Sequence, residues 1–69
     1  MAISKTKRIL IGGLQTILKD KEVITAIALM LKSEDQMLTM LDWIVKHNQE
    51  NPDVDRIIRI AKRISEQVS

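Results

Sequence analysis

The 69-residue chain contains no cysteine, phenylalanine or tyrosine, and it has a single tryptophan, a single histidine and a single proline. Without cysteine, a disulfide framework and a thiolate metal site are both excluded. This absence fits a reducing compartment, and we expect a cytoplasmic protein. With one histidine and no cysteine, the chain offers no nucleophile paired with a base, and no His, Glu and Asp set has metal-ligand spacing. We therefore predict no catalytic residue, no metal site and no cofactor, and we do not expect an enzyme.

Long apolar runs are also absent. The longest apolar-rich run, residues 23–31, is far too short to span a bilayer, so we expect no transmembrane segment. Residues 1–18 contain no apolar h-region followed by a small-residue cleavage site, so we expect no signal peptide. The length allows one domain at most, and we predict a single domain over residues 1–69.

Strand signals are missing as well. The sequence has no alternating polar and apolar run and no Asn-Gly or Asp-Gly turn. Apolar residues instead recur at helical spacing throughout the chain. We predict an all-α fold, a small compact bundle of three to four helices over residues 5–19, 20–32, 34–48 and 52–67.

Short polar motifs mark where these helices begin. Ser33 is followed three residues later by Gln36, which is the spacing of a capping box. We expect Asp20 to cap the second helix. Before the last helix, Asn51 is a suitable N-cap and Pro52 suits the first helical position, where its missing N–H is not needed.

In each predicted helix the apolar residues share one arc of the helical wheel, which predicts the buried face. The second helix is apolar almost all round, with Thr25 as its only polar interior residue, so we expect it to be central and covered on several sides. The predicted buried residues are Ile3, Leu10, Ile11, Leu14, Ile17 and Leu18 in the first helix, Val23, Ile24, Ile27, Met30 and Leu31 in the second, Met37, Leu38, Leu41, Ile44 and Val45 in the third, and Val54, Ile57, Ile58, Ile60, Ala61, Ile64 and Val68 in the last.

Gly12 and Gly13 lie inside the first predicted helix. The apolar arc keeps its phase on both sides of the pair, so we predict one helix that runs through it. The glycines do not have the spacing of a P-loop or of a dinucleotide-binding loop, and no strand precedes them. Gly13 lies at the edge of the apolar arc, where a neighbouring helix can pack against bare backbone. Alternatively, the pair only marks a local kink.

Hydrophobic residues make up 45% of the chain, more than so small a core is expected to hold. The surplus indicates either a second buried surface, in a homodimer or against another protein, or ordinary exposure of apolar residues. Trp43 points away from the apolar stripe of its helix, and Gln36, Met40 and His47 are spaced beside it as one strip. We predict that these four residues bind a protein partner, because Trp and Met are enriched in interfaces. In the alternative, the N-terminal arm or the first helix covers Trp43.

The net charge of +2 is distributed unevenly. Residues 1–32 carry +4, residues 33–55 carry −5 and residues 56–69 carry +3. Most acidic residues of the middle segment lie in predicted first helical turns and His47 lies in a last turn, which are the positions that the helix dipole favours. A basic cluster at the start of the first helix opposes the dipole, so it is either a solvated, frayed end or a contact for an acidic partner. This N-terminal basic cluster consists of Lys5, Lys7 and Arg8.

The last predicted helix carries a second basic cluster on its exposed face. A polar turn followed by a capped basic helix is superficially similar to a helix-turn-helix. However, the connection KHNQEN is longer than the usual turn, and Asp53 and Asp55 lie at the end of the helix that would approach bases and phosphates. This second cluster consists of Arg56, Arg59, Lys62 and Arg63.

Two functions follow from these patterns. The first is a small helical protein–protein interaction module, with an accessory or regulatory role, and a homodimer is one form of it. The alternative is a small nucleic-acid-binding regulator that uses the basic face of the last helix or the N-terminal basic cluster. No small-molecule site is evident in the sequence.

Overall fold

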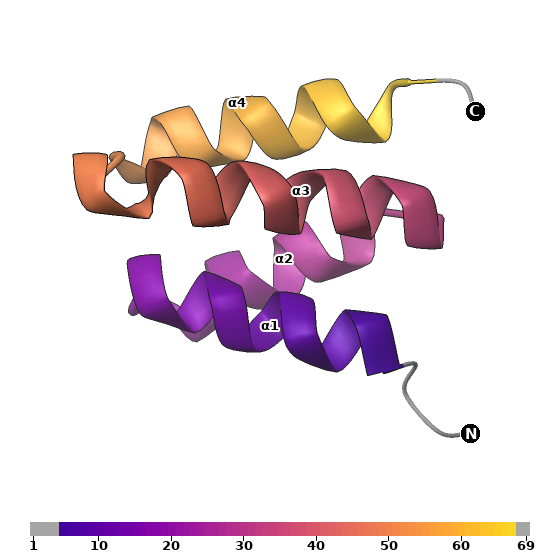
Figure 1. Cartoon of the computed structure of the whole chain (residues 1–69), viewed down its shortest axis with the longest axis horizontal. Coiled ribbons are helices and arrows are strands. Elements are labelled where there is room, and N and C mark those ends of the chain that lie inside the picture. Colours follow the sequence, from indigo (N-terminus) through magenta and orange to yellow (C-terminus); the bar gives the residue numbers. More distant parts are fainter. Residues whose placement is uncertain (1–4, 68–69) are drawn as a thin grey trace.

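The computed structural model describes residues 5–67 and confirms the predicted all-α bundle. Each of the four predicted helices is present, and each is shorter than predicted by one to four residues (Figure 1). Ile3 and Val68, which were predicted to be buried, lie outside the described residues. The elements are α1 (Lys5–Ile17), α2 (Lys21–Met30), α3 (Glu34–His47), the 3-10 turn η1 (Asn48–Glu50) and α4 (Val54–Ser65).

Side-chain caps start three of the helices. The Oδ1 atom of Asp20 accepts a hydrogen bond from the backbone N–H of Glu22 at 2.9 Å, and the Oγ atom of Ser33 accepts one from the N–H of Gln36 at 3.2 Å. Both predicted caps are therefore confirmed. They satisfy N–H groups that have no partner within the helix.

The predicted start of the last helix is wrong. Asp53 is the N-cap of α4, and its Oδ1 atom accepts a hydrogen bond from the N–H of Arg56 at 2.7 Å. Asn51 instead adopts a left-handed conformation with φ of 50° and ends η1. Asparagine tolerates this conformation better than most residues. The extra 3-10 turn therefore moves Pro52 outside α4.

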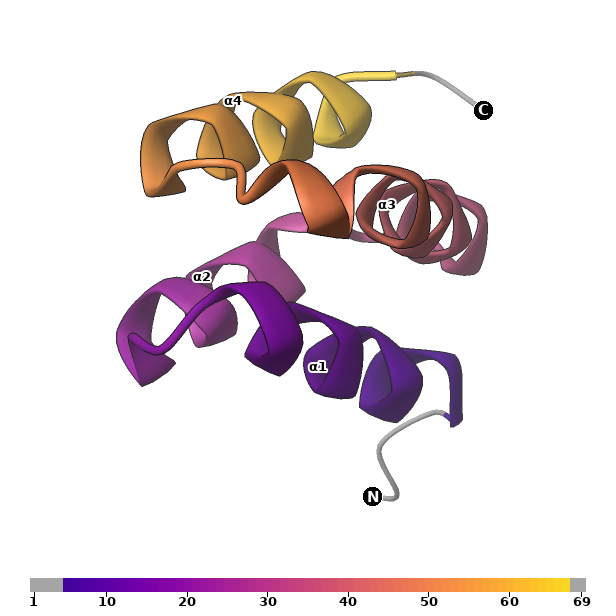
Figure 2. The same cartoon turned by 60° about the vertical axis from the view of Figure 1, so that its left-hand side comes forward.

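The four helices form two stacked hairpins. α1 packs against α2 and α3 packs against α4, while α1 also contacts α3 and α2 also contacts α4 between the two layers (Figure 2). The most extensive of these contacts joins α1 and α3, which run in the same direction (Figure 1). The beginning of α1 and the end of α4 lie at the same end of the molecule.

All four helices contribute to one hydrophobic core, and no described polar or charged side chain is buried. The arcs predicted for α1 and α4 are largely confirmed, although Val54, at the first position of α4, is 42% exposed. Van der Waals packing and removal of apolar surface from water stabilise this arrangement. The core residues are Leu10, Leu14, Leu18, Ile24, Ile27, Ala28, Leu31, Met40, Ile44, Ile57, Ala61 and Ile64.

The predicted central position of α2 is wrong. α2 packs against α1 and α4, while its outer face, which includes Thr25 and Ala26, is exposed. On this face Leu29 is 67% exposed. α3 packs against the same two helices, so each of α2 and α3 has an outer face that no helix of residues 5–67 covers. The apolar residues on the outer face of α2 are therefore exposed and not buried, because a small domain cannot cover all of its apolar surface.

The buried face of α3 also differs from the predicted stripe. Met40 and Ile44 are buried, whereas Leu38 and Val45, which were expected inside, are 49% and 66% exposed. α3 is covered by α1 on one side and by α4 on another, so its buried arc is centred on Met40 and Ile44. A helical wheel shows where apolar residues gather, but it does not show which part of that arc the neighbouring helices cover.

Candidate protein-interaction surface

The strip predicted to bind a partner lies along the contact between α3 and α4. Gln36 donates from Nε2 to the carbonyl oxygens of Ser65 at 3.3 Å and Gln67 at 3.1 Å, and its Oε1 atom accepts from the N–H of Lys32 at 2.9 Å. Gln36 therefore supplies donors to the carbonyl group of the last residue of α4, which has no partner within the helix, and to that of Gln67 just beyond it. Met40 is fully buried, so the prediction that it lies on a surface strip is wrong.

Trp43 is half-buried and packs against the core. Its ring stacks on the His47 ring with centroids 4.6 Å apart and an interplanar angle of 16°. The guanidinium carbon of Arg56 lies 5.6 Å from the centroid of the Trp43 ring, which is cation–π distance. Arg56 is also 3.6 Å from a carboxylate oxygen of Glu50. Residues of α4 and of the end of α3 therefore contact Trp43, whereas the alternative from the sequence placed the N-terminal arm or the first helix over it.

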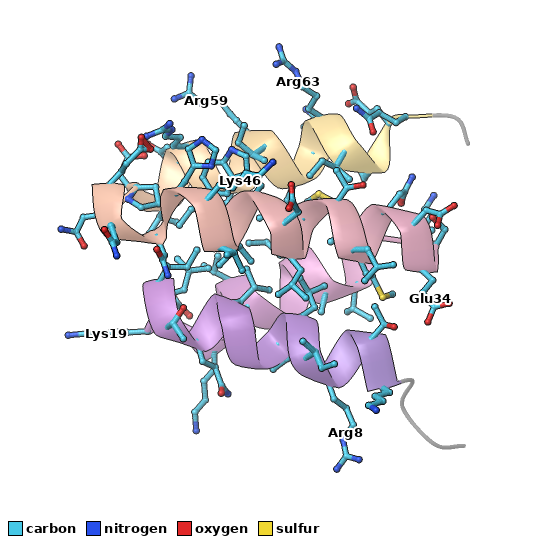
Figure 3. All side chains as sticks on the ribbon, in the orientation of Figure 1. Arg8, Lys19, Glu34, Lys46, Arg59 and Arg63 are labelled. Atoms are coloured by element: carbon cyan, nitrogen blue, oxygen red, sulfur yellow. The ribbon has the colours of Figure 1, made fainter. Side chains whose placement is uncertain are left out.

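The basic residues proposed for nucleic-acid binding lie on two sides of the molecule. Arg59 and Arg63 extend from α4 on the side opposite to Arg8, which extends from α1 (Figure 3). The N-terminal basic cluster and the α4 cluster therefore do not form one continuous patch. Within residues 5–67, no ion pair includes Arg59, Lys62 or Arg63.

The α3–α4 unit is a helical hairpin. The connection spans residues 48–53 and contains η1, and the two helices lie side by side with opposite directions (Figure 1). A helix-turn-helix instead joins two helices at about 90–120° through a turn of three or four residues. The basic face of α4 is therefore presented in a different geometry from that of a recognition helix.

A different surface follows the contact between α1 and α3. Thr6 donates from Oγ1 to a carboxylate oxygen of Glu34 at 2.6 Å. Farther along, a Cβ atom placed on Gly13 would lie 3.0 Å from Cδ1 of Leu41. Both pairs are separated by 28 positions in the sequence, so the two helices keep the same register as they run side by side.

This register brings exposed apolar residues of the two helices together. Ile9 of α1 is level with the turn of α3 that contains Leu38, and Thr16 is level with the turn that contains Val45. Ile9 and Leu38 are both 49% exposed, and Val45 is 66% exposed. We call this surface the α1–α3 strip. It consists of Ile9, Gly12, Gly13, Thr16, Leu38, Leu41 and Val45, none of which carries a charge.

The two glycines form the α1 side of this strip, and the helix runs through them without a break, as predicted. Gly13 provides the predicted close approach, because a Cβ atom there would lie only 3.0 Å from Cδ1 of Leu41, with Ile44 in van der Waals contact at 3.9 Å. Gly12 is exposed, and a Cβ there would have no atom within 4 Å. The hydroxyl group of Thr16 donates to the Gly13 carbonyl at 2.6 Å and is thus satisfied within the helix.

Sequence reasoning missed this strip because it assigned Leu38 and Val45 to the core. One available signal was their spacing, since Leu38, Leu41 and Val45 lie at i, i+3 and i+7 and form one ridge on α3. A second was the width of the α3 apolar arc, which with Met40 and Trp43 included extends over more than one face.

Two other kinds of feature, a metal-ion site and a membrane-spanning helix, are absent from residues 5–67. Among residues 5–67, no group of three or more His, Asp or Glu side chains is placed to hold a metal ion. No helix in this range combines the length and the apolar character needed to cross a membrane. Comparison with family models, with curated proteins and with solved structures found no match to this chain.

Proposed function

We propose that this chain is a small protein-interaction module that binds its partner through the α1–α3 strip. The observation that supports it is the alignment of Ile9, Leu38 and Val45, three large exposed apolar side chains, along one contact between two helices. Single exposed apolar residues are normal on any protein. A contiguous apolar surface bordered by polar residues is instead typical of an interaction site.

Gly12 supports the same proposal. A glycine in a helix interior costs about 0.5–1 kcal/mol relative to alanine. At Gly13 the missing side chain admits Leu41 and so has a role within the fold. At Gly12 no neighbouring atom of the described chain uses the space. Bare backbone at this position allows another chain to approach α1 closely in the middle of the strip.

Site-specific photo-cross-linking in the cells that make the protein tests this function. The probe is an aryl-azide or diazirine amino acid at Val45, which is exposed, so we expect the substitution to change stability little. The matched control carries the same probe at Lys62, on the exposed face of α4. We expect a cross-linked protein product from position 45 that is absent or much weaker from position 62. The same weak signal at both positions would contradict the proposed binding surface.

A second candidate is nucleic-acid binding by the exposed face of α4. It is supported by Arg59, Lys62 and Arg63, which form no ion pair within the described residues. Such unpaired cations favour contact with phosphate groups. The cluster lies away from the α1–α3 strip, so the two candidates can be tested by separate substitutions (Figure 3).

A further inference from the structure

The α1–α3 strip has opposite charges along its two edges. On α1, Lys5 and Gly12 are seven residues apart and form a line just outside Ile9 and Thr16, and Lys19 lies two residues beyond the end of the helix. On α3, Asp35 and Asp42 are also seven residues apart and form a line just outside Leu38 and Val45. The four charged residues are exposed. We call Lys5 and Lys19, with the neighbouring Arg8, the basic edge, and we call Asp35 and Asp42 the acidic edge.

Arg8 extends from α1 away from α3, as expected for an outer edge, and Lys19 extends past the end of α1 (Figure 3). Asp42 already pairs with Lys46, whose Nζ lies 3.1 Å from its carboxylate, but both groups remain about two-thirds exposed. Asp35 has no ion pair within residues 5–67. The strip is thus an apolar surface with a basic border on one side and an acidic border on the other.

We propose that the partner of the strip is a second copy of this chain, related by a twofold axis that runs along the strip. This inference rests on the proposed function. A rotation about that axis exchanges the two edges, so the basic edge of each copy faces the acidic edge of the other. A twofold axis across the strip would instead place each edge opposite the same edge of the second copy, with like charges facing each other.

The register between α1 and α3 determines which groups meet. A rotation about an axis along the strip keeps every residue at its own level. Lys5 and Arg8 then lie opposite Asp35 of the second copy, because the offset of 28 positions aligns the beginnings of α1 and α3. In the middle of the strip, the bare backbone at Gly12 faces the ridge formed by Leu38 and Val45 of the second copy. The exposed apolar residues of each copy are covered by those of the other.

A charge-exchange experiment tests this arrangement. Variant one is Lys5→Glu with Lys19→Glu, which gives the former basic edge two acidic residues and leaves Arg8 as its one cation, so that both edges are predominantly acidic. Variant two is Asp35→Lys with Asp42→Lys, which makes both edges basic. Molar mass is measured across a concentration series by sedimentation equilibrium. We expect the wild type to dimerise, each variant alone to associate about tenfold or more weakly, and an equimolar mixture to form a dimer with one copy of each.

Lys21→Glu with Lys62→Glu serves as the control, because it changes the net charge as variant one does but at exposed positions on α2 and α4. It should dimerise as the wild type does, and circular dichroism should show that every variant is folded. If variant two fails to fold, Asp35→Lys alone replaces it, since this variant keeps the Asp42–Lys46 pair.

A wild type that stays monomeric at every concentration, or variants that associate as the wild type does, would overturn the second-copy assignment. The cross-link from position 45 then separates this failure from that of the proposed function. A cross-link to a different protein, together with a monomeric wild type, retains the binding surface and rejects the second copy. No specific cross-link rejects both.

Discussion

At the residue scale, Gly12 and Gly13 are adjacent, yet their missing side chains have different consequences. The Cβ of any residue at position 13 would lie 3.0 Å from Cδ1 of Leu41, whereas position 12 is open. We expect Gly13→Leu to destabilise the fold by about 1–3 kcal/mol through overpacking between α1 and α3. We expect Gly12→Ala to stabilise it by about 0.5–1 kcal/mol, because alanine favours a helix.

Chemical unfolding of the two variants beside the wild type measures both effects. If both substitutions stabilise the chain, the packing of Leu41 against Gly13 has no energetic weight and the close-approach interpretation is wrong. Gly12→Ala also adds a methyl group to the α1–α3 strip, so its association should weaken while its stability rises. If Gly12 were only a poor helix former, Gly12→Ala would raise the stability of the fold without weakening association.

Trp43 and Val45 provide a second contrast between stability and binding. Trp43 is half-buried between His47, Arg56 and the core, so we expect Trp43→Ala to cost about 2–4 kcal/mol, somewhat less than a fully buried aromatic. Val45 is 66% exposed, so Val45→Gln should change stability by about 0.5 kcal/mol at most and weaken partner binding. Thermal unfolding and a dilution series of each variant give the two quantities.

A stable Trp43→Ala variant that no longer associates would instead support the partner-binding role that the sequence predicted for Trp43. In that case the contact of Trp43 with Arg56 would be a minor one, as expected for cation–π pairs at exposed sites.

At the element scale, α4 presents Arg59, Lys62 and Arg63, which form no ion pair within residues 5–67, on a helix whose other face is in the core. If this face binds nucleic acid, affinity should fall steeply with salt, with a slope of about −0.9 per phosphate contact on duplex DNA. Arg59→Glu with Arg63→Glu should then abolish binding, measured by fluorescence anisotropy of a labelled oligonucleotide. Arg8→Glu with Lys19→Glu changes the net charge equally on a different side and should affect binding much less (Figure 3).

The absence of binding by the wild type at low salt, to both duplex and single-stranded oligonucleotides, would remove this candidate. Equal loss in the two double variants would point to a diffuse charge effect, because α4 would then have no special part in binding.

Helix α3 has one feature that could be predicted from its own sequence and one that could not. Its start was predictable because Ser33 and Gln36 interact within one turn. Its exposed ridge was not, because Leu38 and Met40 are equally apolar in the sequence and only the positions of α1 and α4 decide which is covered. The same limit applies to the start of α4. The sequence predicted Asn51 as the N-cap, but the chain forms an additional 3-10 turn there and Asp53 caps the helix.

At the scale of the whole molecule, the fold class and four helices were predictable from periodicity, since each helix carries its own apolar arc. The pairing of the helices was not, because four amphipathic helices can be joined in several ways that all bury their arcs. The α1–α3 strip depends on that pairing. Ile9 and Leu38 are far apart in the sequence, and only the parallel contact of two helices with the same offset at Thr6 and Gly13 brings them together.

The uneven charge of the sequence has its structural counterpart in this pairing. The segment with net +4 contains α1 and α2, and the segment with net −5 contains α3, η1 and the first residues of α4. Because α1 and α3 lie side by side, the charge separation along the chain becomes a separation across one surface. A chain that paired α1 with α4 in place of α3 would have a similar composition and a similar core without such a surface.

The open space at Gly12 also makes it simple to attach a label to the protein at a single position. The chain has no cysteine, so Gly12→Cys would introduce a unique thiol, and its Cβ would meet no neighbouring atom within 4 Å. One fluorophore or spin label could be attached there without repacking the core. Because a bulky label in the middle of the strip would also keep a second chain away, the labelled protein would be a reference in which this surface stays uncovered. Comparing its molar mass and its thermal stability with those of the unlabelled chain would separate a loss of association from a loss of folding.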